Sequence, residues 1–218
     1  MKIELGAERP ANFAEYWKGQ YDVFSHFEYA CGIPSPLFAV TTVKENGKPN
    51  VCFNAWSSFA GGGDGFYVIM PGIYRKGHTY KDILRTGEFV VNFLSKDYYD
   101  ACIRTIGQNG DETDEFEAGG FTREKAAEIS TPRINEAFLC IECKKIKDIV
   151  LEENADTSVI IGKVLHIAAL EDYAKGIDKK YGDDGFMMNI HAPKNLLTGE
   201  GKPSALAVCK IVRVNEDG

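Results

Sequence analysis

The stretch of residues 50–59 places the strongest constraint on how this chain folds. Read as a β-strand, it points successive side chains to opposite faces. One face then carries a cysteine, an asparagine, a tryptophan and a serine, a mixture that a strand buried only for packing rarely shows. Small residues near its end leave room for a flat molecule, and Trp56 offers a stacking surface. We therefore predict that this strand end holds a planar cofactor and that the glycine-rich run 61–65 behind it is a turn or loop.

The length and composition indicate one sizeable soluble domain. The chain has 218 residues, of which 44% are hydrophobic and 26% charged, so it can bury a core without disulfides or metals. Its net charge of -7 argues against a nucleic-acid or anionic-membrane binder, because such proteins carry a basic face. No secretory signal begins the sequence, and no run approaches the roughly 18 apolar residues that span a bilayer. We expect a cytoplasmic protein with neither nucleic acid nor membrane among its partners.

The cysteines and histidines give no sign of a metal site. Cys140 and Cys143 form the single C-x-x-C pattern, but they fall in a predicted strand that would point the two thiols to opposite faces. A redox C-x-x-C prefers the start of a helix, and a zinc site needs a second pair of ligands. We interpret both as structural thiols. The four histidines never stand at i, i+4 spacing or beside an acidic cluster, so no metal is expected.

Seven segments have the pattern of strands, and four have the pattern of short helices. The strands are predicted at 36–44, 50–59, 66–70, 88–94, 137–150, 158–170 and 204–213. The helices are predicted at 78–85, 98–106, around 114–117 and, as one turn, at 123–127. Asn46 and Gly47 are a strong hairpin signal between the first two strands. Because helices and strands do not alternate, the order favours an α+β, mainly β fold, an antiparallel barrel with peripheral helices, over a doubly wound sheet.

Aromatic residues recur at near-helical spacing in the first 33 residues. They are Phe13, Tyr16, Trp17, Tyr21, Phe24, Phe27 and Tyr29. This spacing predicts an N-terminal helical arm of one or two short helices, residues 1–33, followed by the main domain, 34–218, within a single domain overall. The aromatic stripe is expected to pack on that domain or on a second subunit, and direct contact with a ligand is the alternative.

Residues 74–79 have the composition of an anion site. Arg75, Lys76 and the hydroxyl of Thr79 precede or begin the predicted helix at 78–85, where free N–H groups and the helix dipole already favour an anion. The alternative is that Thr79 only caps the helix and the two cations are solvated. No Walker sequence and no G-x-G-x-x-G is present, so this would be a phosphate site of another kind. Asn92 is similarly open, since it could satisfy core backbone groups or reach a cofactor edge.

Four stretches in a fixed order resemble the flavin reductase-like proteins with an FMN-binding split barrel, the group that includes flavoredoxin. They are Thr41-Thr42 with its Asn-Gly turn; residues 50–59; Thr79, Ile83 and Thr86-Gly-Glu-Phe-Val-Val-Asn92; and Asp114-Glu-Phe, Gly120-Phe-Thr, Pro132, Glu136-Ala and Glu142-Cys143. The resemblance covers roughly residues 35–170. It implies a six-stranded antiparallel split β-barrel that forms a homodimer, with FMN near the subunit interface.

The resemblance also implies which residues bind the cofactor. The flavin ring would lie against Asn54, Ala55, Trp56, Ser57 and Ser58. The phosphate would lie by Thr79, and Asn92 is a further candidate. Relatives often carry an arginine two residues before the position of Thr79, where this chain has Gly77, so Arg75, Lys76 or His78 would take its place. FMN is expected in preference to FAD.

The function implied is an FMN-dependent oxidoreductase that transfers hydride from NAD(P)H to flavin and on to a small acceptor. The cofactor carries this chemistry, so no residue of the chain is assigned as catalytic. The alternative is a flavoredoxin-like FMN electron-transfer protein that a protein partner reduces, which the acidic charge would suit. A barrel that binds no flavin is a third possibility.

Overall fold

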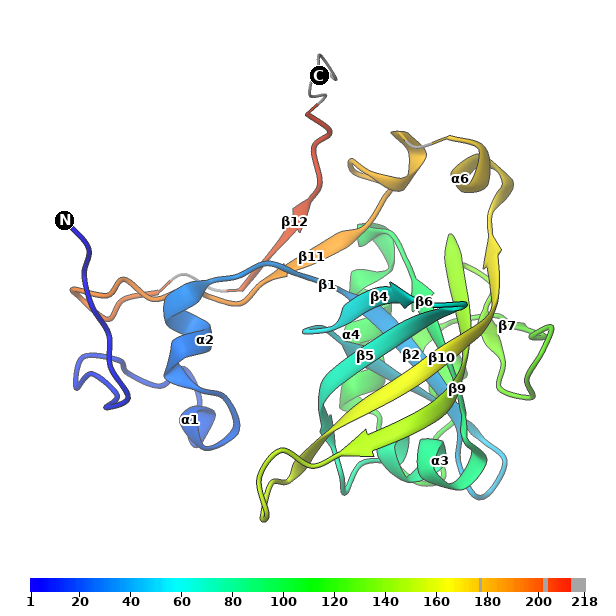
Figure 1. Cartoon of the computed structure of the whole chain (residues 1–218), viewed down its shortest axis with the longest axis horizontal. Helices are drawn as coiled ribbons and strands as arrows, with labels where there is room; N and C mark the ends of the chain where they lie inside the picture. Colours follow the sequence, from blue (N-terminus) through cyan, green and yellow to red (C-terminus); the bar gives the residue numbers. More distant parts are fainter. Residues whose placement is uncertain (177, 202–203, 213–218) are drawn as a thin grey trace. The chain divides into compact units, whose positions relative to one another are not determined.

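The computed structural model describes residues 1–176, 178–201 and 204–212 (Figure 1). The chain forms two compact units. One contains residues 1–35 and 188–207, and the other contains residues 36–187 and the segment that begins at Val208. The expected division into an arm, 1–33, and a domain, 34–218, stays a prediction; in the structure, a late segment of the chain packs with the first 35 residues. Among the described residues, no helix has both the length and the apolar character needed to span a bilayer.

The larger unit is built on an antiparallel sheet of seven strands. They are β2 (Phe38–Val43), β3 (Pro49–Asn54), β4 (Ser58–Gly62), β5 (Gly65–Tyr74), β6 (Glu88–Phe93), β9 (Leu139–Ile149) and β10 (Thr157–Ala169), in the order β3-β2-β6-β9-β10-β5-β4. Gly47 has a positive φ of 82° in the hairpin between β2 and β3, so the predicted Asn-Gly turn is confirmed. The expected mainly β fold with peripheral helices is likewise confirmed.

The two edge strands of this sheet, β3 and β4, follow one another in the sequence. Only residues 55–57 separate them, and such a link reaches at most about 14 Å from Cα to Cα. Seven strands laid flat would hold their edges roughly 29 Å apart. The sheet must therefore curl until its edges approach, which is the geometry of a split barrel.

The prediction of a single strand at 50–59 is wrong, because the strand is interrupted between β3 and β4. Trp56 has a positive φ of 57°, which no strand residue adopts, and it ends the alternation of faces. The same break gives the sheet one strand more than the expected six. The glycine-rich run is also not a simple loop, since Gly61 and Gly62 belong to β4 and only Gly63 and Asp64 make its turn to β5.

Three helices pack beside the sheet of the larger unit. They are α3 (His78–Thr86), α4 (Tyr99–Gly107), which follows the short turn η1 (Lys96–Tyr98), and α5 (Glu115–Gly119). They match the helices predicted at 78–85, 98–106 and around 114–117. Ile83 on α3 is fully buried in the apolar core, together with Phe38, Phe89 and Ile160 from the sheet.

The helical turn predicted at 123–127 is wrong. Arg123 and Glu124 form β7, which pairs with β8 (Arg133–Ile134). The buried carboxylate of Glu142 accepts hydrogen bonds from the N–H groups of Ala127 and Glu128, at 2.9 and 2.8 Å. A side chain from β9 thus satisfies backbone groups that a helix would otherwise have paired.

The remaining elements are short. They are α1 (Gln20–Val23), α2 (His26–Cys31), β1 (Ser35–Pro36), α6 (Glu171–Lys175), η2 (Asp178–Lys180), β11 (Met187–Ile190) and β12 (Ala205–Val208). The two short helices expected in the first 33 residues are confirmed, and the rings of Phe24 and Tyr29 contact that of His191 in the same unit. The strand predicted at 204–213 is shorter, and residue 213 lies outside the described residues. Strands β1, β11 and β12 form a small sheet.

A buried ion pair fixes the edge strand β3 to α5. Glu115 Oε1 lies 2.8 Å from Lys44 Nζ, and Glu115 Oε2 accepts from the N–H of Val51 on β3 at 2.8 Å. Lys44 also donates to the carbonyl oxygens of Gly110 and Thr113. Burial raises the pKa of Glu115, and the hydrogen bonds from Lys44 and Val51 oppose that shift. The side chain therefore supplies a partner to an edge amide that has no neighbouring strand.

We expect Glu115→Gln to lower the free energy of unfolding by about 3 kcal/mol, because it leaves the Lys44 ammonium buried without its counter-ion. Glu112→Gln is the matched control. Glu112 also pairs with a lysine, but its side chain is 84% exposed where that of Glu115 is 1% exposed. The control should cost less than about 1 kcal/mol. Equal urea unfolding midpoints for the two variants would contradict a stabilising role for the buried pair of Glu115 and Lys44.

Candidate functional site

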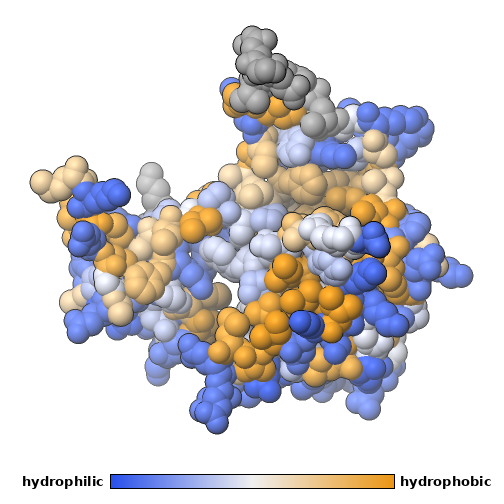
Figure 2. Space-filling model, viewed as in Figure 1, coloured by the Kyte–Doolittle hydropathy of each residue, from blue (hydrophilic) through white to orange (hydrophobic). Residues whose placement is uncertain are grey.

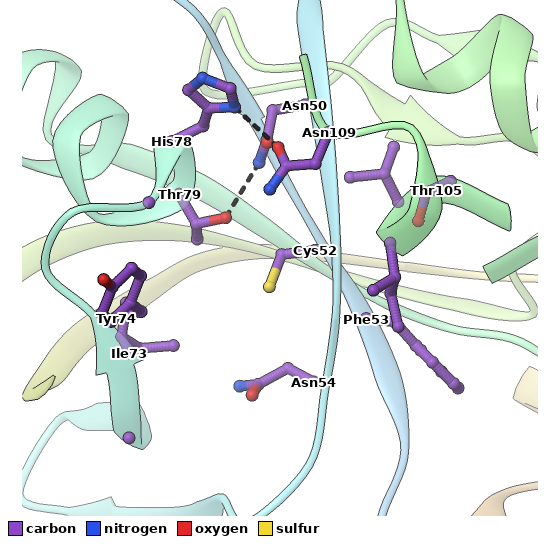
Figure 3. A pocket seen from close by; sticks show the side chains of 14 residues that line it. Asn50, Cys52, Phe53, Asn54, Ile73, Tyr74, His78, Thr79, Thr105 and Asn109 are labelled. Atoms are coloured by element: carbon purple, nitrogen blue, oxygen red, sulfur yellow. Dashed lines mark hydrogen bonds between the residues drawn. The ribbon is translucent and has the colours of Figure 1, made fainter. Parts of the chain in front are cut away.

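A cavity of about 270 Å³ lies in the larger unit, between the edge strand β3 and the start of α3 (Figure 3). Its walls are residues 50–54 of β3, 72–74 at the end of β5, 77–79 at the start of α3, and 105, 106 and 109 at the end of α4. Strands β3 and β5 lie near opposite edges of the sheet, so the curl of the sheet brings these segments together.

The side chains of Cys52 and Asn54 project from β3 into the cavity (Figure 3). Asn54 Nδ2 is buried and has no hydrogen-bond partner among the residues that the structure describes. An unpaired buried donor costs about 1–3 kcal/mol, so it indicates a place where a ligand's acceptor atom binds. Burial raises the pKa of the Cys52 thiol, against a smaller lowering from a hydrogen bond with Thr79. Cys52 is therefore a neutral thiol that contributes shape rather than charge.

The start of α3 gives the other end of the cavity its electrostatic character. Gly77 is the N-cap and supplies no side-chain acceptor, so the first N–H groups of the helix remain available. The Thr79 hydroxyl lies in the same wall (Figure 3). This end combines amide donors, a hydroxyl and the positive end of a helix dipole, which together favour an anion.

His78 stands between two oxygen acceptors at the rim of the cavity. Its Nδ1 lies 2.8 Å from Asn109 Oδ1, and its Nε2 lies 2.6 Å from Asp111 Oδ1. Both ring nitrogens thus lie within hydrogen-bond distance of a protein oxygen. The hydrogen bond from His78 lowers the pKa of Asp111. The residues of this rim therefore hold the imidazole in one orientation beside the start of α3.

Three of the site residues predicted from sequence line this cavity: Asn54, His78 and Thr79. Residues 55–58 follow directly after it but are not part of its wall. Among them, Ala55 is buried, and Ser57 Oγ donates to the carbonyl of Ala55 at 3.2 Å.

The other three predicted residues make contacts away from the cavity. Arg75 donates to the carbonyl oxygen of Ala155 at 3.1 Å, and Lys76 pairs with Asp156 at 2.8 Å. Asn92 is fully buried: its amide nitrogen faces backbone oxygens, including that of Ala39, and its oxygen accepts from the N–H of Ile134 at 3.0 Å. A binding role for these three residues stays a prediction.

Several cavity residues were absent from the predicted set. They are Asn50, Cys52, Ile73, Tyr74, Thr105 and Asn109. The strand period could have found Cys52, because it shares a face with Asn54. Asn109 follows α4 and comes beside His78 only through the tertiary fold, so no local pattern indicates it.

The described residues contain no cluster of three histidine, cysteine, aspartate or glutamate side chains placed to hold a metal ion. Cys140 and Cys143 are free and buried. Burial raises the pKa of Cys140 to about 12 and also raises that of Cys143. Both thiols therefore behave as small apolar groups of β9.

Comparison with known proteins decides the family. Residues 30–183 match the flavin reductase like domain, which is well over half of the chain. The chain belongs to the flavin reductase-like family. A protein of Aquifex aeolicus (strain VF5), itself uncharacterized, is 31% identical over 186 residues, which cover 82% of this chain and 88% of that protein.

Solved structures of similar fold include the nitrilotriacetate monooxygenase component B from Bacillus cereus, with a TM-score of 0.70, 18% identity, and coverage of 98% of this chain and 100% of that one. The flavoredoxin of Desulfovibrio vulgaris (Miyazaki F) has a TM-score of 0.61 and 20% identity, and the match covers 84% of this chain and 91% of that one. At these identities the likeness establishes the fold of a flavin reductase-like split barrel.

The reactivity of the thiols tests which cysteines are buried in the folded protein. At pH 8, iodoacetamide should alkylate the exposed Cys31 first and leave Cys102 and Cys140 unmodified, because burial raises the pKa of both to about 12. Their thiolate fraction at pH 8 is on the order of 10⁻⁴. Mass spectrometry of tryptic peptides gives the labelling at each position, and protein unfolded in guanidinium serves as the control in which every cysteine reacts. Alkylation of Cys140 in the folded protein at the rate of Cys31 would contradict the buried placement.

Proposed function

We propose that the cavity between β3 and α3 binds FMN and that the protein is a flavin-dependent oxidoreductase. The unpaired donor of Asn54 carries this proposal, because it stands at the opposite end of the cavity from the start of α3. One end thus needs an uncharged acceptor, and the other needs an anion. FMN has both, in the pyrimidine edge of its ring and its terminal phosphate. Membership of the flavin reductase-like family supports the same ligand.

The ring end is shaped by β3 and the end of β5. Asn54 Nδ2 would donate to the pyrimidine edge of the flavin, and Cys52 and Ile73 would form the apolar wall against its plane. Residues 55–58 follow directly, so their N–H groups and the Ser57 hydroxyl would hold the ring edge beyond the cavity wall. Such fixed donors stabilise negative charge on the ring when it is reduced.

The phosphate end is at the start of α3. The first N–H groups of the helix and the Thr79 hydroxyl would bind the phosphate oxygens. His78 would act from the rim, since its two ring nitrogens already face Asn109 and Asp111. Arg75 and Lys76 would act at longer range, since Ala155 and Asp156 already hold them. A single helix N-terminus with one hydroxyl matches a phosphate monoester, so FMN is the expected cofactor in preference to FAD.

The bound flavin would accept hydride from NAD(P)H and pass electrons to a small acceptor. The chain's own work is to bind the cofactor, orient its ring and exclude water from the β3 side. No side chain of the cavity needs to move a proton for this, and none is assigned as catalytic.

A second copy of the chain would complete the site. The cavity is smaller than the roughly 300–1,000 Å³ of a complete ligand site. Ile146, Leu165 and Ile167 on β9 and β10 leave 48%, 43% and 49% of their surface exposed, and Figure 2 shows hydrophobic surface over this part of the sheet. A patch of this kind marks a protein–protein interface, so we propose a homodimer.

The proposed reaction is tested by the absorbance spectrum of the purified protein after FMN is added, followed by anaerobic NADH and then NADPH. A bound flavin spectrum that bleaches within seconds of adding one nicotinamide supports the reductase and identifies its donor. Absence of flavin binding, measured by gel filtration of the mixture, would overturn the proposal.

An electron-transfer protein of the flavoredoxin kind is the second candidate. The net charge of -7 favours it, because complementary charge steers encounter with a basic redox partner. Bound flavin that stays oxidised with both nicotinamides, but is reduced rapidly by a ferredoxin-like donor, would select this function over the reductase. Rates that fall steeply with added salt would agree with it.

Asn54→Ala should weaken binding of FMN and of riboflavin by a similar factor, about ten-fold, because Asn54 is placed at the ring end that both share. Asn135→Ala is the matched control. Asn135 is exposed, and its substitution should leave both affinities unchanged. The affinities come from quenching of flavin fluorescence. A loss restricted to FMN would mean that Asn54 faces the phosphate instead of the ring.

A further inference from the structure

A chain of four buried side chains connects the core of the larger unit to the cavity. Thr42 Oγ1 on β2 donates to Asp82 Oδ2 on α3 at 2.7 Å. Asn50 Nδ2 on β3 donates to Thr42 Oγ1 at 3.0 Å and to Thr79 Oγ1 on α3 at 2.9 Å. All four side chains are buried. The last link, from Asn50 to Thr79, is visible in Figure 3.

The direction of these hydrogen bonds is fixed by counting protons. A hydroxyl has one proton, and that of Thr42 goes to the carboxylate of Asp82. Thr42 must therefore accept from its other neighbour, so Asn50 presents its NH₂ group and not its oxygen. The second N–H of the same group points to Thr79 Oγ1.

The consequence concerns the proton of Thr79. Because Thr79 Oγ1 accepts from Asn50, its own proton is not used in that bond and is free to point into the cavity. The Cys52 side chain lines the same cavity, but sulfur is a weak acceptor, so a phosphate oxygen would be the stronger partner for this proton.

We infer that Asn50 is a positioning residue, which holds the Thr79 hydroxyl as a hydrogen-bond donor toward the phosphate of the bound cofactor. This inference rests on the proposed function and assigns to Asn50 a role that acts through Thr79. Asp82 and Thr42 set the orientation of the Asn50 amide, and Asn50 sets that of the hydroxyl.

Asn92 offers a comparison within this protein. Its amide nitrogen faces the backbone oxygens of Ala39 and Val90 and, at 3.3 Å, the hydroxyl of Thr41, which does not line the cavity. The amide nitrogen of Asn50 instead faces two side-chain hydroxyls, one of which lines the cavity. Its bonds therefore orient side chains.

The test compares FMN with riboflavin, which has the same ring and no phosphate. Dissociation constants are measured by flavin fluorescence quenching for the unsubstituted protein and for Asn50→Leu, Thr79→Val and the double variant. We expect Asn50→Leu to weaken FMN binding about ten-fold and riboflavin binding less than two-fold. Thr79→Val should do the same, and the double variant should lose no more than either single one. Thr79→Ser, which keeps the hydroxyl, should retain the preference for FMN.

A matched control separates positioning from general loosening of the fold. Thr41→Val removes a buried hydroxyl from β2, the strand that carries Thr42, and this hydroxyl donates to the carbonyl of Pro132 at 2.7 Å. It should leave the ratio of FMN to riboflavin affinity unchanged. Asn50→Ala is measured beside Asn50→Leu, and circular dichroism melting identifies any variant that does not fold. If neither Asn50 variant folds, the ratio of FMN to riboflavin affinity is compared between Thr79→Val and Thr79→Ser. A donor role of the Thr79 hydroxyl requires that Thr79→Val lose the preference for FMN and that Thr79→Ser keep it.

The outcomes distinguish this inference from the proposed function. A protein that binds neither flavin overturns both. A protein that binds both flavins, but whose Asn50 variants lose FMN and riboflavin equally, retains the proposed function and refutes the role of Asn50. Additive losses in the double variant would also refute it, because Asn50 would then act independently of Thr79.

Discussion

The fold depends on the shortness of the link between β3 and β4. Residues 55–57 join strands at opposite edges of a seven-stranded sheet, and the sheet must curl for so short a segment to reach. Trp56 makes the break possible by adopting a positive φ of 57°, an uncommon and costly conformation for a bulky residue. The curl also brings the edge strand β3 beside the end of β5 and the start of α3. The cavity is thus a direct product of the link that closes the barrel.

The edge strand that forms one wall of the cavity is held by side chains where an inner strand would have neighbours on both sides. Glu115 binds the amide of Val51 and pairs with Lys44, and its Oε1 lies 4.0 Å from His78 Nδ1 at the rim. Asn50 on the same strand binds Thr79 on α3. Buried polar networks of this kind are stabilising only when their members are satisfied, and they then fix one geometry. In this protein they fix β3 against α3, the two elements between which the ligand would bind.

Much of the fold follows from local pattern, and the errors have particular physical causes. The strand pattern and the Asn-Gly turn predicted β2 and the position of β3, and a helix stop signal predicted the end of the helix that the structure places at His78–Thr86. The break at Trp56 could not be predicted, because a positive φ at tryptophan has no sequence signal. In the site, Asn54, His78 and Thr79 were found from their own segments. Asn50 was not predicted as a site residue, because its partners lie on two other elements. Arg75 and Lys76 were predicted as phosphate ligands, because the sequence does not reveal their contacts with residues 155 and 156, which arise only in the folded chain.

The central claim is that a flavin phosphate binds at the start of α3 while the ring lies against β3. The most direct test is an NMR titration of ¹⁵N-labelled protein with FMN, followed through the backbone amide shifts. The account predicts the largest changes at residues 50–58 and 77–79, with those at 77–79 absent when riboflavin replaces FMN. Shifts confined to residues 1–35, or none at all at saturating FMN, would contradict it.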